Sequence, residues 1–168
     1  NKDSFCFGYF HHSKDEYNHT KTFLSLLKKY GQTMPSDLAR EFRFASNAVI
    51  NKDYVVISSN DFTYIINAND GTIINKLNFS FKVKPLIINK YLFLVTKNNY
   101  LISWDLKRNK IIYSYNINQK IADFLNIKKK KINVKNIMMI NSKLFVFLNN
   151  SYILKFSLKG SLEEINKI

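Results

Sequence analysis

The sequence is poor in the residues that usually punctuate or crosslink a chain. Its 168 residues include four glycines, two prolines and one cysteine, Cys6. A single cysteine excludes a disulfide within the chain. No apolar run reaches the roughly 18 residues that a membrane-spanning helix needs. Acidic residues are also scarce, 12 against 26 lysines and arginines. The sequence therefore predicts neither a disulfide-stabilised scaffold nor a helical membrane span.

The residues of catalysis do not form a recognisable set. Cys6, His11, His12 and His19 lie near one another in the sequence, but their spacing matches no zinc site. The stretch "SFCFGYF" favours a strand with a buried thiol instead. Paired carboxylates, a Ser/His/Asp set and a glycine-rich phosphate loop are all missing. We therefore expect no catalytic residue, no bound metal and no cofactor, and hence a protein that is not an enzyme.

Positive charge is abundant, with a formal net charge of +14. Such a balance suits nucleic acid, an anionic membrane or an acidic protein as partner. Most lysines are scattered, and the one dense cluster is Lys128, Lys129, Lys130 and Lys131. Zinc-finger spacing, arginine-rich helices and glycine-aromatic RNA motifs are not found. The four lysines are the candidate partner-binding site, and a solvated loop or a module for nucleic acid or anionic membrane remains the alternative.

Hydrophobic residues make up 46% of the chain and are arranged in repeats. Residues 48–74 align with residues 86–112 without a gap, at an offset of 38. A third copy, 138–160, follows at an offset of 52 from the second. Turns rich in asparagine recur at the same places in all three copies. A period near 38 is that of a propeller blade.

Each copy contains four short segments rich in β-branched and aromatic residues, separated by turn signals. In the first copy the expected strands are 48–50, 54–58, 62–67 and 72–77. The sequence therefore predicts an all-β fold, a partial β-propeller of about three four-stranded antiparallel blades. The blades should span about 46–79, 84–117 and 134–166, with an insertion at 118–135.

Two segments outside the blades carry helix signals. In the N-terminal segment, 1–45, Ser13 and Glu16 have the spacing of a capping box, and a helix is expected at about 15–30. In the insertion, "KIADFLNI" predicts one short helix before the lysine run. We expect the first helix to cap the blades or to bind a partner.

The segment "YIINANDGTIINKL" resembles the repeat of the PQQ-like (quinoprotein-type) β-propeller family, L-x-A-L-D-x-x-T-G-K-x-x-W. The resemblance covers about 46–168. Asn67 and Asp105 stand at the family's Asp, whereas Ser157 replaces it. Asn75 and Tyr113 stand where the family has its docking Trp. The expected structural turn positions are Asn67, Asp70, Gly71, Asp105, Asn109 and Gly160.

This resemblance implies a non-catalytic scaffold that binds proteins, similar to outer-membrane assembly scaffolds of the BamB type. It implies a periplasmic or outer-membrane-associated location, with a cytoplasmic one left open. The alternative it implies is a fragment of a PQQ- and calcium-dependent quinoprotein dehydrogenase. The scarcity of carboxylates that would bind calcium argues against this alternative.

Three blades do not close a ring, because propellers have about four to eight. The apolar faces at the two ends of such a stack need a cover. We expect further blades of a longer protein, a second copy in a homodimer, or the N-terminal helix to supply it.

Overall fold

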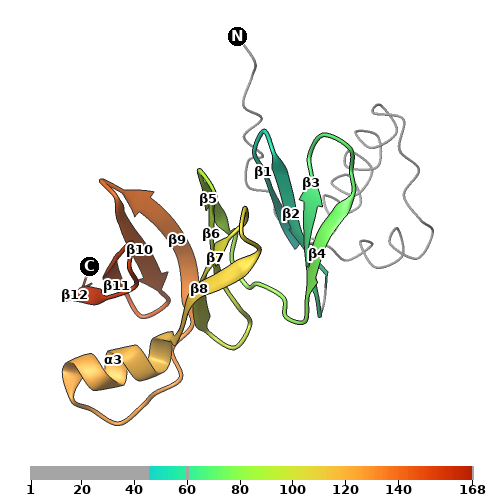
Figure 1. The fold of residues 1–168 in the computed structure, drawn as a ribbon. Coiled ribbons are helices and arrows are strands. Elements are labelled where there is room, and N and C mark those ends of the chain that lie inside the picture. The colour runs from blue at the N-terminus through green and yellow to red at the C-terminus, as the bar shows by residue number, and fades with distance from the viewer. Residues whose placement is uncertain (1–45, 60, 168) are drawn as a thin grey trace. The chain divides into compact units, whose positions relative to one another are not determined.

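The computed structural model describes residues 46–59 and 61–167. This part of the chain contains three four-stranded antiparallel sheets and one helix (Figure 1). The predicted fold class, a partial propeller of three blades, is confirmed. The predicted N-terminal helix, Cys6 and the three histidines lie outside the described residues.

In each sheet the four strands pair in the order in which they follow one another along the chain. The first sheet consists of β1 (Ser46–Ile50), β2 (Tyr54–Ser58), β3 (Thr63–Asn67) and β4 (Ile73–Leu77). The second consists of β5 (Leu86–Ile88), β6 (Tyr91–Val95), β7 (Tyr100–Asp105) and β8 (Lys110–Asn116). The third consists of β9 (Val134–Ile140), β10 (Lys143–Leu148), β11 (Tyr152–Ser157) and β12 (Leu162–Lys167).

The chain divides into two compact units, and the boundary lies between Ser80 and Phe81. The described part of the first unit is the sheet β1–β4, which has its own apolar cluster. The buried members of this cluster alternate along β2 and β3: Val55, Ile57, Tyr64 and Ile66. Alternation places them on one face of the sheet.

The second unit contains the other two sheets, which share one core. Phe93, Val95 and Leu101 of the second sheet lie in the same buried cluster as Val146 and Phe156 of the third. All five side chains are at most 2% exposed. Since these residues belong to the central strands of both sheets, the sheets pack against each other through their middles.

Asparagine supplies the left-handed backbone conformations that the scarce glycines do not. Asn89, Asn99, Asn109, Asn126 and Asn141 all have positive φ, between 47° and 60°. Asparagine tolerates this region because its short amide can bond to the nearby backbone. This explains how a chain with four glycines forms so many tight turns.

Candidate functional site

The only helix in the described part of the chain, α3 (Ile117–Leu125), lies between β8 and β9. Asn116 has an extended backbone, and its side-chain oxygen accepts the N–H of Gln119 at 3.1 Å. This is an N-cap, which stabilises the first turn of a helix. The sequence-based helix, 120–127, began three residues too late because this cap was not recognised. At the other end Asn126 has φ 52°, and the N–H of Ile127 bonds to the carbonyl of Ala122 at 3.0 Å.

The insertion is held at both of its ends. Ile117 and Ile121 of α3 are 0% and 4% exposed and belong to the core of the second unit. At the far end, the N–H of Ile132 donates to Oδ1 of the buried Asn118 at 3.3 Å. Nδ2 of Asn99 donates to the carbonyl of Ile132 at 2.8 Å. The helix and the return to β9 are thus fixed to the sheets, and the residues between them extend outward.

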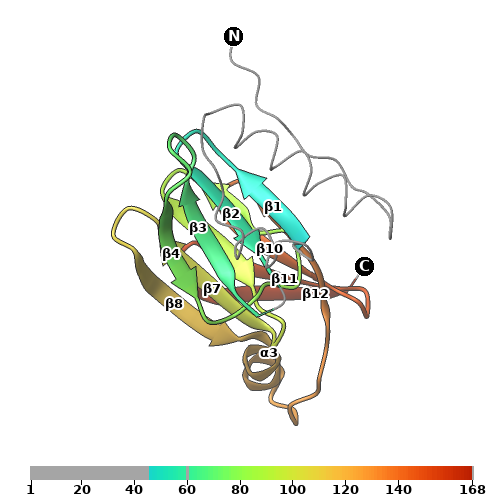
Figure 2. The ribbon, with the colours of Figure 1, turned by 90° about the vertical axis from the view of Figure 1, so that its right-hand side faces the viewer.

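The apolar side of α3 continues beyond the part that is covered. Phe124 and Leu125 follow Ile121 at three- and four-residue steps, so they share its side of the helix. They are nevertheless 48% and 44% exposed, and Ile127 is 49% exposed. In Figure 1 the helix projects from the sheets of the second unit, and Figure 2 shows it at one end of that unit. We call residues 124–131 the α3 tip.

The predicted binding residues Lys128, Lys129, Lys130 and Lys131 form the second half of the α3 tip and are all exposed. No hydrogen bond or ion pair connects their side chains to any residue of 46–59 or 61–167. No acidic residue occurs from 124 to 134. The nearest one, Asp123, accepts a hydrogen bond from Nε2 of Gln119 at 2.8 Å. The tip therefore combines exposed apolar groups with unneutralised positive charge.

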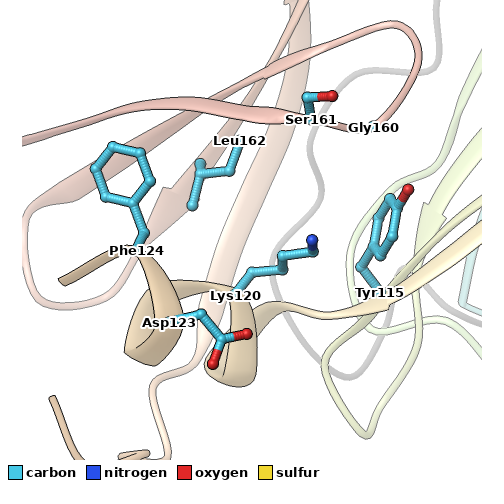
Figure 3. Close-up of a pocket in the computed structure, with 7 residues that line it drawn as sticks. All are labelled: Tyr115, Lys120, Asp123, Phe124, Gly160, Ser161 and Leu162. Atoms are coloured by element: carbon cyan, nitrogen blue, oxygen red, sulfur yellow. The ribbon is translucent and has the colours of Figure 1, made fainter. Parts of the chain in front are cut away.

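A groove of about 360 Å³ lies between α3, the end of β8 and the turn from β11 to β12 (Figure 3). Its lining consists of Tyr115, Lys120, Asp123, Phe124, Gly160, Ser161 and Leu162. In Figure 3, Phe124 and Leu162 lie on one side and Lys120 extends toward Tyr115 on the other. Nζ of Lys120 lies 4.5 Å from the centre of the Tyr115 ring, a cation–π contact.

Gly160, one of the lining residues, closely approaches two tyrosines. The rings of Tyr113 and Tyr115 are stacked with centroids 5.1 Å apart. A Cβ at Gly160 would lie 2.4 Å from the Tyr115 ring and 3.1 Å from the Tyr113 ring. Burial raises the pKa of the Tyr113 hydroxyl to about 12, so this phenol stays protonated at neutral pH. The stacked tyrosine rings serve as a packing surface for Gly160.

The predicted turn positions lie at the last hairpin of each sheet, and a polar side chain organises each turn. Oδ1 of Asn67 accepts the N–H of Asn69 at 2.9 Å, and Oδ1 of Asp105 accepts that of Arg108 at 2.9 Å. In the third sheet Oγ of Ser157 accepts the N–H of Ser161 at 3.1 Å. Each turn then has one residue with positive φ, namely Gly71 (73°), Asn109 (53°) and Gly160 (86°).

Hydrogen bonds within the turns lower the pKa of two carboxyl groups. The backbone N–H of Thr72 and then its hydroxyl lower the pKa of Asp70. The N–H of Arg108, followed by the charge of Lys90 with Nζ 3.9 Å away, lowers the pKa of Asp105. Both carboxylates stabilise turns.

Within residues 46–59 and 61–167, no group of three histidines, cysteines, aspartates or glutamates is placed to hold a metal ion. The same residues contain no helix that is long and apolar enough to cross a membrane. The chemistry available at the groove and the tip is non-covalent binding through aromatic, aliphatic and ammonium groups.

Comparison with known proteins shows the fold and no family. No family model and no curated protein sequence matches the chain. Sqt1 of Saccharomyces cerevisiae is 15% identical with a TM-score of 0.53, and the match covers 72% of this chain and 33% of Sqt1. A chain in a Saccharomyces cerevisiae complex of Dbp5 with Nup159 and Gle1 is 14% identical with a TM-score of 0.51, covering 74% and 30%.

BamB from Moraxella catarrhalis is 9% identical with a TM-score of 0.40, and the match covers 71% of this chain and 49% of BamB. These structures are β-propellers of the WD40 type or similar. The chain spans about a third to a half of their lengths. The two Saccharomyces cerevisiae structures, whose TM-scores exceed 0.5, support the propeller architecture and do not separate the PQQ-like repeat from other propeller repeats.

The sequence analysis singled out the four lysines and overlooked the apolar half of the tip and the whole groove. A signal for the tip was present, because Ile117, Ile121, Phe124 and Leu125 follow helical spacing up to the lysines. The groove had no comparable signal. It is formed by Tyr115 and Leu162, which are far apart in the sequence and meet only because two sheets pack together.

Proposed function

We propose that this chain is part of a non-catalytic β-propeller that acts as a protein-interaction scaffold, and that a protein partner binds at the groove between α3 and the β11–β12 turn. The observation that carries the proposal is the groove itself, a concave site of about 360 Å³ lined by aromatic, aliphatic and charged side chains. A concave site with apolar surface and a few polar groups is a default candidate for binding.

The lining specifies the partner's chemistry. Leu162 and Phe124 offer apolar surface on one side, and the partly buried Lys120 offers one positive charge beside Tyr115. The one carboxylate of the lining, Asp123, accepts a hydrogen bond from Nε2 of Gln119. A segment with an apolar side chain followed by an acidic one fits this arrangement. The Lys120 ammonium would pair with the acid while Leu162 packs against the apolar group.

The proposed location is the cell envelope. Its support is the resemblance of the repeat "YIINANDGTIINKL" to that of PQQ-like propellers. Fractionation of the source cells with an antibody against the full-length protein tests the location. Recovery in the cytosol would contradict it without bearing on the groove.

Site-specific photocrosslinking tests the partner site. Ser161 is exposed at the groove, and Ser114 is exposed on β8 outside the groove lining, so the two serines form a matched pair. A benzophenone amino acid at position 161 should give one discrete crosslinked protein in source cells, and the same group at 114 should not. The Lys120→Glu variant should then weaken binding of the captured protein at least tenfold, since it reverses the only cation of the groove.

Equal crosslinking from both positions would contradict the proposal.

Quinoprotein catalysis, the alternative function, has its own test. A red-shifted absorbance on adding pyrroloquinoline quinone with calcium, together with dye reduction, would show that the protein is an enzyme and would contradict the proposal of a non-catalytic scaffold.

A further inference from the structure

We infer that the α3 tip binds the surface of an anionic lipid bilayer, with Phe124, Leu125 and Ile127 entering the interfacial layer and Lys128, Lys129, Lys130 and Lys131 pairing with headgroup phosphates. The inference shares Phe124 with the groove, but it concerns the exposed end of the helix and is tested with vesicles in the absence of a protein partner. It would give the scaffold a second contact, by which it is held at a membrane.

The apolar half of the tip carries the first argument. Ile117 and Ile121 occupy the core, yet the same side of the helix continues into Phe124 and Leu125, which are only about half covered. With Ile127, three large apolar side chains are between 44% and 49% exposed within four positions. Single exposed apolar residues are common, whereas a cluster indicates a contact surface. Amphipathic helices that lie in the bilayer interface bury such groups among the headgroups and upper acyl chains.

Charge carries the second argument. The four lysines follow the apolar cluster directly, and no carboxylate interrupts residues 124–134. Groups of four to eight basic residues beside an apolar or amphipathic segment are a signature of anionic lipid binding. The apolar cluster and the basic cluster supply the two contributions on which the binding of amphipathic segments depends, namely buried apolar area and attraction to anionic lipids.

The shape and the residue types favour a bilayer over other polyanions. The tip is the end of a helix that lies at one end of the second unit, and an exposed end suits a flat surface (Figure 1). The tip contains no arginine, which is the residue that most often pairs bidentately with phosphate and guanine. It has one aromatic residue, Phe124, where single-stranded nucleic acid sites usually stack several bases. Lysines bind as compact point charges, which suits a fluid layer of headgroups.

Flotation of the full-length protein with vesicles tests the inference. Vesicles of phosphatidylcholine with 30 mol% phosphatidylglycerol should carry the protein, and vesicles of phosphatidylcholine alone should carry much less. Replacing Lys128, Lys129, Lys130 and Lys131 by Gln should weaken binding at least about a hundredfold, since each lysine near an anionic surface contributes about fivefold. A matched control replaces the four scattered exposed lysines Lys52, Lys107, Lys110 and Lys159 by Gln. It has the same net charge and should keep most of the binding.

Insertion needs a separate readout, because lysines alone could adsorb the protein. The chain has one tryptophan, Trp104, which is buried. Phe124→Trp therefore adds a reporter whose emission should shift to the blue with anionic vesicles and be quenched by brominated acyl chains. The pair Phe124→Ser and Ile127→Ser should weaken binding at least tenfold. The pair Ile112→Ser and Leu158→Ser, at positions exposed to the same degree, should not.

Several results would overturn the inference. These are no flotation with the anionic vesicles at low salt, equal loss in the clustered and scattered lysine variants, or a Trp at position 124 that stays in water. Binding of single-stranded RNA or of an acidic peptide that exceeds vesicle binding would also overturn it. Thermal unfolding of every variant, followed by circular dichroism, shows that the fold is retained.

Discussion

The final turns of the three sheets are organised from within, whereas the α3 insertion also depends on residues outside it. Asn67, Asp105 and Ser157 each accept a backbone N–H of their own turn. The insertion depends on Asn99, which lies in the β6–β7 turn and bonds to Ile132 across 33 positions of sequence. Local contacts leave a pattern in the sequence, and distant contacts do not. The comparison separates a repeated framework from the element in which binding is proposed.

The two regions also differ in how they use apolar residues. In the sheets of the second unit, Leu144, Val146, Leu154 and Phe156 are fully buried, while at the α3 tip three side chains of similar size are nearly half exposed. Buried apolar groups stabilise the fold. Exposed ones contribute little to it, which leaves them free for an external partner. Mutations in the two regions should therefore differ sharply in their effect on stability.

The largest difference should be between Phe156→Ala and Phe124→Ala. The Phe156 side chain is 0% exposed, and its removal leaves a cavity, so we expect a loss of about 4 kcal/mol in the free energy of unfolding. Phe124→Ala should change it by less than about 0.5 kcal/mol. Urea unfolding followed by Trp104 fluorescence reports the second unit, which contains both residues. A loss above about 2 kcal/mol in Phe124→Ala would mean that the tip is part of the framework.

The next largest effect is expected at Gly160, where a turn of the framework meets the groove. Gly160→Ala places a methyl group 2.4 Å from the Tyr115 ring at a φ of 86°. Clash and backbone strain together should cost about 3 kcal/mol. Gly71→Ala, at φ 73° in the β3–β4 turn, carries the backbone cost of about 1 kcal/mol. Equal losses in the two variants would show that the tyrosine contact is unimportant.

Most of the framework was predictable, because its rules are local. The expected strand 54–58 coincides with β2, and the expected 62–67 differs from β3 by one residue. Phe62 falls outside β3 because its N–H bonds to Oγ of Ser59 in the preceding turn, at 3.2 Å. This bond is a side-chain detail that strand propensity does not contain.

The site was predicted only in part, for a physical reason. The lysine run is visible in the sequence, but whether Phe124 is buried depends on how far α3 extends beyond the sheets. The groove requires β8 and β12 to come together, which follows from the packing of two sheets. Helical periodicity states which side chains share a face and leaves open what covers that face.

A smaller effect is expected at the start of the insertion. Asn116→Ala removes the acceptor for the N–H of Gln119 and should lower stability by about 1 kcal/mol. Asn116→Asp keeps an acceptor and should restore it. Helical circular dichroism and urea midpoints of both variants are the measurement. Asn116→Ala should also lower the free energy of binding to anionic vesicles, and by more than it lowers the free energy of unfolding. The reason is that a frayed helix no longer positions Phe124. Unchanged vesicle binding in Asn116→Ala would show that the tip binds without an intact α3 helix.

The smallest expected effect is a dependence of folding stability on pH, and it should differ between two turns of the framework. The fold lowers the pKa of Asp105, first through the N–H of Arg108 and then through Lys90. A lowered pKa in the folded state means that the ionised carboxylate stabilises the fold. This contribution is fully present above the unfolded pKa, near 3.9, and is lost as the pH falls through the lower folded value. Asp105→Asn keeps an acceptor for Arg108 but loses the charge.

The urea midpoint of Asp105→Asn should therefore lie slightly below that of the natural protein at pH 7, and the difference should shrink as the pH falls below the unfolded pKa of the carboxyl. The difference is small because Lys90 lies 3.9 Å away and is 43% exposed, which screens the pair. In the third sheet an uncharged residue, Ser157, occupies the equivalent place. Ser157→Asn should thus shift the midpoint by the same amount at both pH values. The contrary result would be a midpoint difference for Asp105→Asn that does not change with pH. It would show that the charge of Asp105 does not contribute to stability beyond the hydrogen bond to Arg108. The turns of the second and third sheets would then respond to acid in the same way.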